Sequence, residues 1–212
     1  MTKIGILGSG EVGQALSSAF MGHGYQIVLG SDHAEKTAEF KKENPELETA
    51  SFEQCARLAD LAVLCVKGTA AEKVVGQVKA GLSGKTVIDT TNPIADAPPQ
   101  NGVLKYITSL DESLMERLQR IAPDVHFVKA FNSIGSGLMD KIPILEGQDR
   151  PCSSSVAIMK AQKRPYLKFL GNLGLKLKIW AWLKVQGQLN LWQYCGASRD
   201  FSKTSGRMLS SF

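Results

Sequence analysis

The feature that most constrains this fold is a glycine-rich stretch close to the N-terminus. Gly8-Ser9-Gly10-Glu11-Val12-Gly13 has the spacing G-x-G-x-x-G. It follows a short apolar run, residues 3–7, that is typical of a buried parallel strand. Apolar residues then recur at helical spacing over residues 12–20. A strand, a glycine turn and a helix start in this order predict a βα unit that binds a dinucleotide, rather than a plain glycine-rich turn.

Each glycine of the motif has a structural role. Gly8 allows a tight turn, Gly10 lets a pyrophosphate approach the backbone, and Gly13 lets the helix pack close to the strand. The phosphates are expected on the unpaired amides at the helix N-terminus, where the helix dipole favours anions. The candidate pyrophosphate-binding residues are therefore Gly8, Ser9, Gly10, Glu11, Val12 and Gly13.

The residues after the second predicted strand, residues 26–30, bear on the choice between NAD and NADP. NAD-preferring sites place an acid about 20 residues past the glycines to hold the ribose 2′-hydroxyl, and Asp32 lies near that position. Ser31 leaves room for a 2′-phosphate, and His33 and Lys36 supply positive charge. Both cofactors stay open at this point.

Asp32 has a second interpretation, because aspartate is a good N-cap residue. A helix is predicted over residues 34–42, and Asp32 lies just before it. Under this interpretation Asp32 caps the helix and does not face the ribose.

The rest of residues 1–150 alternates between strand and helix patterns. Strands are predicted over residues 61–66, 86–89 and 125–132, and helices over 52–59, 72–80 and 109–121, with Asp111 and Glu112 in the first turn of the last helix. This alternation with short connections predicts an α/β fold, a Rossmann-type doubly wound parallel sheet. Ligands bind beyond the carboxyl ends of such strands, which adds as candidates Val66, Lys67, Asn92 and Pro93. Lys67 is alternatively a solvated loop lysine.

Composition excludes several classes of protein. The chain has 212 residues, of which 43% are hydrophobic and 21% charged, as in globular proteins. It has no uncharged apolar run of the roughly 18 residues that a membrane helix needs, and no signal-peptide pattern. Its four cysteines form no C-x-x-C pair, and no cluster has metal-ligand spacing. We expect a cytoplasmic protein with no metal and no membrane partner.

Three stretches together resemble one known family. They are residues 3–13, Asp89-Thr90-Thr91-Asn92-Pro93, and Val128-Lys129-Ala130-Phe131-Asn132. They are similar to the NADP oxidoreductases described as coenzyme F420-dependent, to which the oxidoreductase domain of STEAP metalloreductases is related. The resemblance covers residues 2 to about 150. It implies that the nicotinamide lies at the ends of the strands predicted over residues 61–66, 86–89 and 125–132, which adds to the candidates Ala130, Phe131 and Asn132.

The resemblance implies hydride transfer between NADP, or NAD, and a flavin-like acceptor such as F420, FMN or FAD. Positioning supplies most of the rate in such a reaction and the cofactors supply the chemistry, so we name no catalytic residue. Asp32 stands where many members carry an arginine for the 2′-phosphate, which weakens the expected NADP preference. Two alternatives stay open: a reductase of a small substrate, similar to pyrroline-carboxylate reductases, and a non-catalytic dinucleotide-binding module.

The chain changes character after Arg150. Residues 1–150 hold 15 Lys and Arg against 19 Asp and Glu, a net charge of −4, whereas residues 151–212 hold 10 against one, a net charge of +9. All three tryptophans lie in the second segment. We therefore treat residues 1–150 as the dinucleotide-binding domain and residues 151–212 as an atypical C-terminal segment. A basic tail that binds nucleic acid is one interpretation of this charge, but we expect no nucleic-acid partner.

Our interpretation is that residues from about Pro151 onward are a frame-shifted version of the family's own C-terminal segment. Val185 to Leu191, given suitable codons and read from the third base, becomes ARAIEP, and Val156 to Lys163 becomes CGNNEGAKK in the same frame. Arg199 to Phe212 becomes GFFKNEWTHAFKL. The alternative is a genuine basic tail that binds an acidic partner. As written, the segment is expected to lack the last strand and the closing helices, so a homodimer is doubtful.

Overall fold

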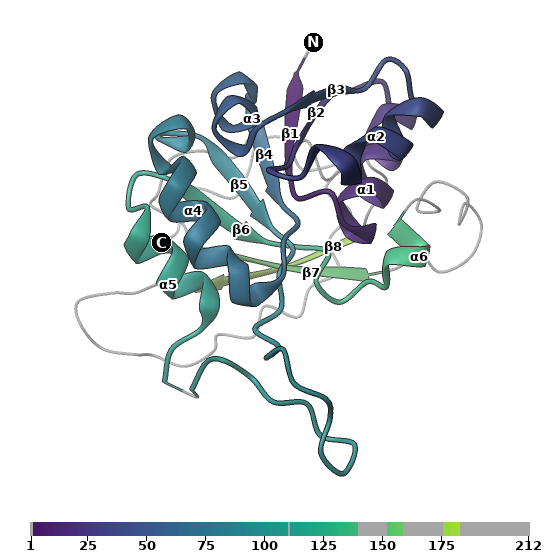
Figure 1. The fold of residues 1–212 in the computed structure, drawn as a ribbon. Coiled ribbons are helices and arrows are strands. Elements are labelled where there is room, and N and C mark those ends of the chain that lie inside the picture. Colours follow the sequence, from purple (N-terminus) through teal and green to yellow (C-terminus); the bar gives the residue numbers. More distant parts are fainter. Residues whose placement is uncertain (1, 110, 140–151, 159–175, 183–212) are drawn as a thin grey trace.

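A single twisted sheet forms the centre of the molecule (Figure 1). The computed structural model describes residues 2–109 and 111–139, and the backbone of residues 152–158 and 176–182. The strand order is β3-β2-β1-β4-β5-β6-β7-β8, and the first six of these strands are parallel. Those six are β1 (Lys3–Leu7), β2 (Gln26–Gly30), β3 (Glu48–Ala50), β4 (Leu61–Leu64), β5 (Thr86–Asp89) and β6 (His126–Lys129).

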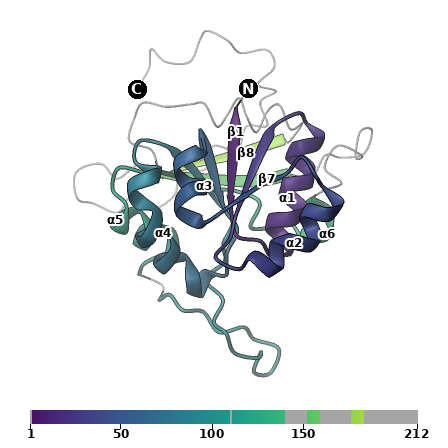
Figure 2. The same cartoon turned by 45° about the horizontal axis from the view of Figure 1, so that its top comes forward.

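Helices cover both faces of the sheet (Figure 2). One face carries α1 (Glu11–Gly22), α2 (Ala34–Glu43) and α6 (Ser136–Met139), and the other carries α3 (Phe52–Leu58), α4 (Gly68–Leu82) and α5 (Leu114–Ile121). The strands alternate between the two cores: in β4, Val63 packs with α1 and Leu64 packs with α4. Burial on both faces explains why these strands are continuous apolar runs. The predicted Rossmann-type fold is confirmed.

The order of strands reverses between β1 and β4, since the chain moves outward from β1 to β3 and then continues from β4 on the other side. A crevice outside the carboxyl ends of the strands is expected at this switch point, because the flanking connections leave in opposite directions. The carboxyl ends of β1, β4, β5 and β6 therefore bound the candidate site.

Some elements differ from the sequence prediction. The helix predicted from residue 109 begins at Leu114, because Ser113 and Glu116 form a capping box: the Glu116 amide donates to Ser113 Oγ at 3.2 Å, and Glu116 Oε2 accepts from the Ser113 amide at 2.8 Å. Asp111 and Glu112 thus precede the helix. Helix α4 begins four residues earlier than predicted, and the short strand β3 had no predicted counterpart.

The C-terminal segment contributes two strands where none was expected. Strand β7 (Cys152–Ile158) pairs antiparallel with β6, and β8 (Lys176–Trp182) pairs parallel with β7. The expectation that residues 151–212 lack a last strand is therefore wrong for these two stretches, because the open edge of β6 is paired. The closing helices and the frame-shift interpretation concern residues that lie mostly outside the described part of the chain.

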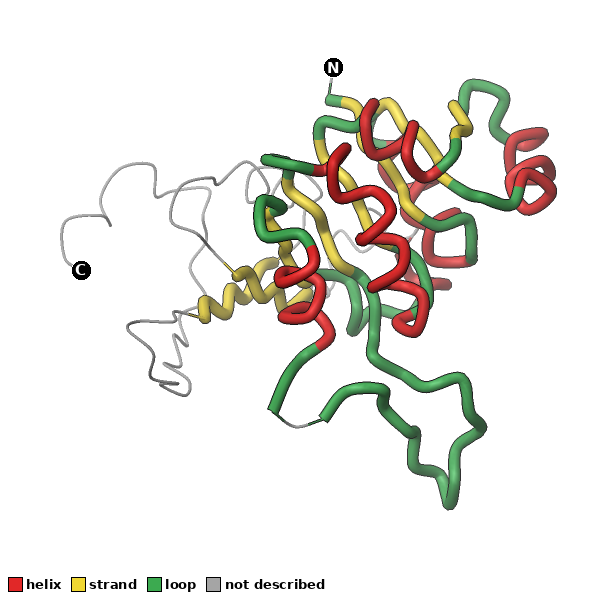
Figure 3. The backbone as a smooth tube through the Cα atoms, turned by 60° about the vertical axis from the view of Figure 1, so that its left-hand side comes forward, coloured by secondary structure: helices red, strands yellow, loops and turns green. Residues whose placement is uncertain are grey.

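A long excursion between β5 and α5 projects from the body of the molecule (Figure 3). Its two arms meet at the bridges Ile94–Tyr106 and Gln100–Val103, and its side chains are largely exposed. Its base lies next to the carboxyl end of β5, since the Ile107 amide donates to the Pro93 carbonyl at 2.9 Å. Residues 96–102, which include Pro98 and Pro99, are exposed at the outer part of this excursion.

Candidate cofactor-binding crevice

The glycine turn at the end of β1 has the geometry that its sequence predicts. Gly8 has a φ of +127°, a backbone angle that residues with a side chain rarely adopt. A Cβ on Gly13 would lie 1.9 Å from the Gly8 carbonyl oxygen, so α1 packs directly on the turn. A Cβ on Gly10, in contrast, would meet no atom of the described residues within 4 Å. Packing therefore requires Gly13, and the open space beside Gly10 is free for a ligand.

The first turn of α1 offers backbone donors toward this open space. The first hydrogen bond within the helix joins the Gln14 amide to the Gly10 carbonyl at 3.0 Å, so the amides of Glu11, Val12 and Gly13 have no partner within the helix. Gln14 Nε2 also donates to the Ser9 carbonyl at 3.1 Å and holds the turn in place. Free amides and the positive end of the helix dipole form an anion site.

Two hydroxyls meet where the predicted ribose-binding residues lie. Ser9 Oγ and Ser31 Oγ are 2.9 Å apart, and Ser31 Oγ accepts a bond from the His33 amide at 3.1 Å. The structure thus joins the glycine turn of β1 to the end of β2. Lys36, one turn into α2, is exposed, and His33 Nδ1 lies 3.4 Å from Glu35 Oε1.

Asp32 does not cap α2, so that interpretation is wrong. The helix begins at Ala34, as predicted, so the residue directly before it, His33, occupies the N-cap position, and its side chain makes no cap bond. Asp32 Oδ2 instead accepts from Gln77 Nε2 of α4 at 3.5 Å, and the same nitrogen donates to Glu53 Oε1 at 2.5 Å. That bond from Gln77 is the main reason why the pKa of Glu53 lies below its usual value.

The side chain of Lys67, which follows β4, is exposed but forms an ion pair. It takes the N-cap position of α4, and its Nζ lies 3.0 Å from Asp96 Oδ1 at the base of the projecting excursion. Thr69 Oγ1 donates to the other oxygen of Asp96 at 2.9 Å. The bonds from Lys67 and Thr69 hold the pKa of Asp96 below its usual value. Val66, the preceding candidate, is half-buried.

Asn92 and Asn132 join the ends of β5 and β6. Asn92 Nδ2 donates to the Asn132 carbonyl at 3.0 Å, and Asn132 Nδ2 donates to Asn92 Oδ1 at 3.3 Å. The two residues lie 40 positions apart in the chain, and Pro93 follows directly. The structure thus brings together the two most polar candidates of the nicotinamide end.

Ala130 and Phe131 lie at the same strand end but turn their side chains into the core. Both are fully buried, and the Phe131 ring packs edge-on against Phe20 of α1 with centroids 6.3 Å apart. Phe131 has a φ of +63°, an unusual backbone for a bulky residue. Only the backbone of these two candidates can face a ligand in the crevice.

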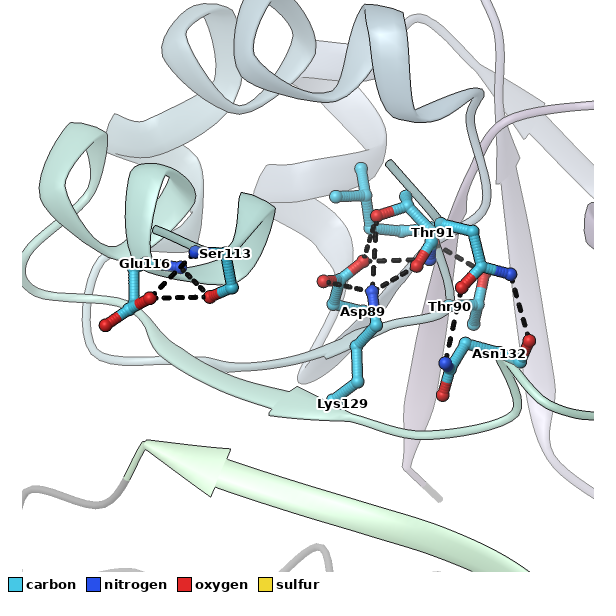
Figure 4. A network of polar contacts seen from close by, with 9 residues as sticks. Asp89, Thr90, Thr91, Ser113, Glu116, Lys129 and Asn132 are labelled. Atoms are coloured by element: carbon cyan, nitrogen blue, oxygen red, sulfur yellow. Dashed lines mark hydrogen bonds and ion pairs between the residues drawn. The ribbon is translucent and has the colours of Figure 1, made fainter. Parts of the chain in front are cut away.

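A buried polar cluster next to the asparagine pair was missed by sequence reasoning (Figure 4). Asp89 and Lys129 are direct partners in the β5–β6 register, and Lys129 Nζ lies 2.9 Å from Asp89 Oδ2. Thr91 completes the cluster by donating its amide and its hydroxyl to Asp89 Oδ1, at 2.9 and 2.7 Å. An aspartate that ends a short, otherwise uncharged strand is the signal that would have drawn attention to it.

The described residues suit binding and positioning better than covalent chemistry. Burial raises the pKa of the Cys55 and Cys65 thiols to about 12, which makes them poor nucleophiles. No group of three His, Cys, Asp or Glu side chains within the described ranges is placed to hold a metal ion. No helix among those ranges is long and apolar enough to cross a bilayer. The open helix N-terminus offers backbone donors for an anion, and the asparagine pair offers amide donors and acceptors.

The comparisons with known proteins agree on one family. Residues 3–93 match the family model "NADP oxidoreductase coenzyme F420-dependent". The F420-dependent NADP reductase of Methanothermobacter marburgensis is 31% identical over 150 residues, which cover 65% of this chain and 66% of that protein. The chain thus spans about two thirds of that relative. Metalloreductase STEAP3 of Rattus norvegicus is 26% identical over 66% of this chain and 26% of its own length.

Solved structures share the fold. A candidate F420-dependent NADP reductase from Arthrobacter sp. FB24 superposes with a TM-score of 0.74 at 22% identity, covering 85% of both chains. A pyrroline-5-carboxylate reductase from Coxiella burnetii gives a TM-score of 0.58 at 16% identity, covering 84% of this chain and 58% of that one. Residues 3–93, which run from β1 past the end of β5, belong to the coenzyme F420-dependent NADP oxidoreductase family.

Proposed function

We propose that this protein is an NADP(H)-dependent oxidoreductase that transfers a hydride between the nicotinamide and a flavin-like acceptor such as coenzyme F420. The observation that carries the proposal is the open N-terminus of α1. Three backbone amides and an empty space beside Gly10 lie at the topological switch of the sheet, where an anionic pyrophosphate fits.

The residues divide along the crevice into three groups. The amides of Glu11 to Gly13 hold the pyrophosphate. The Ser9 and Ser31 hydroxyls, with Lys36, take the adenine ribose and its 2′-phosphate, while the Asp32 carboxylate bonds to Gln77 on α4. Asn92 and Asn132 keep unused amide donors and acceptors for the nicotinamide carboxamide, because each spends only part of its capacity on the other.

The reduced nicotinamide ring, when bound, would be the hydride donor. The chain's part is to hold that ring at a fixed depth and to leave one ring face open to the acceptor. Val66 and the backbone of Ala130 to Asn132 line the surrounding strand ends. The acceptor takes the hydride together with one proton from water, so the reaction needs no titrating side chain at the crevice.

An acceptor panel tests this proposal. NADPH oxidation is followed under anaerobic conditions with F420, FMN, FAD and pyrroline-5-carboxylate as separate acceptors, and NADH is tested beside NADPH. Turnover with F420 is the expected result. Turnover with only the pyrroline substrate would favour the small-substrate reductase. Tight NADPH binding with no turnover on any acceptor would favour a non-catalytic dinucleotide-binding module.

We also propose, as an expectation from the sequence, that residues 151–212 are read out of frame. Such a chain would dimerise weakly, since the segment that closes the fold in similar proteins is replaced. Resequencing the gene across the Arg150 codon should reveal an inserted or deleted base. An unbroken frame, with these residues regularly packed in an experimental structure, would contradict the proposal.

A further inference from the structure

The polar cluster beneath the nicotinamide end does more than fill the core. Asp89 is fully buried and Thr91 is 3% exposed, while the side chain of Lys129 is 16% exposed. Buried charges are costly unless they are paired and hydrogen-bonded. This pair is retained at the edge of the crevice, on two strand ends whose next residues lead directly into the candidate site.

The two charges hold both backbone polar groups of one residue. Asp89 Oδ1 accepts from the Thr91 amide at 2.9 Å, and Lys129 Nζ donates to the Thr91 carbonyl oxygen. Thr91 Oγ1 adds a third link, since it donates to Asp89 Oδ1 at 2.7 Å. The residue before Asn92 is therefore held at both of its backbone polar groups, the amide by Asp89 of β5 and the carbonyl by Lys129 of β6.

We call Asp89, Lys129 and Thr91, with the bonds between them, the clamp. Asn92 is the first exposed residue after this clamp. Its amide nitrogen donates to the Asn132 carbonyl, and Asn132 lies three residues beyond Lys129 on the other strand. The clamp and the asparagine pair thus join the same two strand ends at two successive levels (Figure 4). A shift of the Thr91 carbonyl would move Asn92 relative to Asn132.

We propose that Lys129 is a positioning residue: through Asp89 and the Thr91 backbone it sets Asn92 at the place where the nicotinamide half of the cofactor is bound. Lys129 does not touch the ligand itself. The inference rests on the proposed function, because it concerns the same crevice. It extends that proposal to a residue whose side chain faces the core beneath the site.

Binding measurements separate this role from a general effect on folding. The dissociation constants of NADPH and of 2′,5′-ADP, which lacks the nicotinamide half, are measured by calorimetry for the parent and for Lys129→Met. We expect NADPH binding to weaken about tenfold, which is the effect of losing about 1.4 kcal/mol, and 2′,5′-ADP binding to change less than about twofold. Lys85→Met is the matched control, since Lys85 Nζ bonds to the Ala56 and Arg57 carbonyls near the opposite end of β5.

A double-mutant cycle then tests the route through Asn92. If Lys129 acts through Asn92, Asn92→Ala and Lys129→Met together weaken NADPH binding no more than Asn92→Ala alone. Additive effects, or an equal loss for both ligands, would overturn the inference. Lys129→Gln, which keeps a donor, replaces Lys129→Met if urea unfolding shows that the latter does not fold. A parent protein that binds NADPH no tighter than 2′,5′-ADP would instead contradict the proposed function.

Discussion

The proposed pyrophosphate end and the proposed nicotinamide end of the crevice are built by different means. At the pyrophosphate end, one continuous stretch from Gly8 to Gly13 forms the site from backbone amides and from the absence of side chains. At the nicotinamide end, two strand ends some 40 residues apart meet through side chains, with the buried Asp89–Lys129 pair below and the asparagine pair above.

The difference explains why the two ends respond differently to mutation. A site formed from backbone and empty space is sensitive to any added side chain, even where the fold has room for it. A site formed from a side-chain network is sensitive to any lost partner, because the remaining polar groups stay buried and unpaired. The first end should therefore lose binding before stability, and the second should lose both.

Gly10→Val tests the pyrophosphate end and has the largest expected effect. The branched side chain would fill the space where the phosphates lie, so NADPH should bind at least about 100-fold more weakly, equivalent to about 2.7 kcal/mol. Gly22→Val, at the other end of α1 and also without close neighbours, is the control. Fluorescence titration of NADPH measures the dissociation constants of both variants. Parent-like binding by Gly10→Val would contradict the placement of the pyrophosphate at this site.

Asp89→Asn tests the nicotinamide end through stability. The exchange leaves the Lys129 charge without its counter-ion in a mostly buried position, so the free energy of unfolding should fall by about 2 kcal/mol. Asp96→Asn, which breaks the exposed pair with Lys67, should cause no measurable loss. Urea unfolding compares the two variants. Equal losses in the free energy of unfolding would show that the buried pair stabilises the fold no more than the exposed pair does.

Asp32→Arg probes the border of the pyrophosphate end, with a smaller effect. An arginine there adds a charge-assisted contact to a 2′-phosphate and removes a repelling carboxylate, so the NADP-to-NAD preference should rise about tenfold, or 1.4 kcal/mol. The ratio of dissociation constants for NADPH and NADH gives the result. An unchanged ratio would mean that position 32 does not face the ribose.

The fold and the first end of the crevice could be predicted from the sequence because their determinants are local. The strands are continuous apolar runs, and the glycine turn carries its own geometry at Gly8, Gly10 and Gly13. The start of α5 was missed because the Ser113–Glu116 capping box outweighs the acidic residues before it. Strand β3 was missed because only three residues form it, and none of them is fully buried.

The second end required knowledge of how strands pair. Asp89 and Lys129 face each other because β5 and β6 lie in one particular register, and a shift of one residue would put their side chains on opposite faces. The side chains of Ala130 and Phe131 also looked available from the sequence, but the turn at φ +63° sends Phe131 into the core against Phe20.

An NMR titration of the full chain tests the central claim, that one dinucleotide spans both ends, most directly. Amide shifts are recorded with 2′,5′-ADP and then with NADPH. We expect 2′,5′-ADP to perturb the amides of Ser9 to Gly13 and Ser31, and NADPH to perturb these and also the side-chain amides of Asn92 and Asn132. Identical perturbations by the two ligands, or none at the glycine turn, would contradict the account.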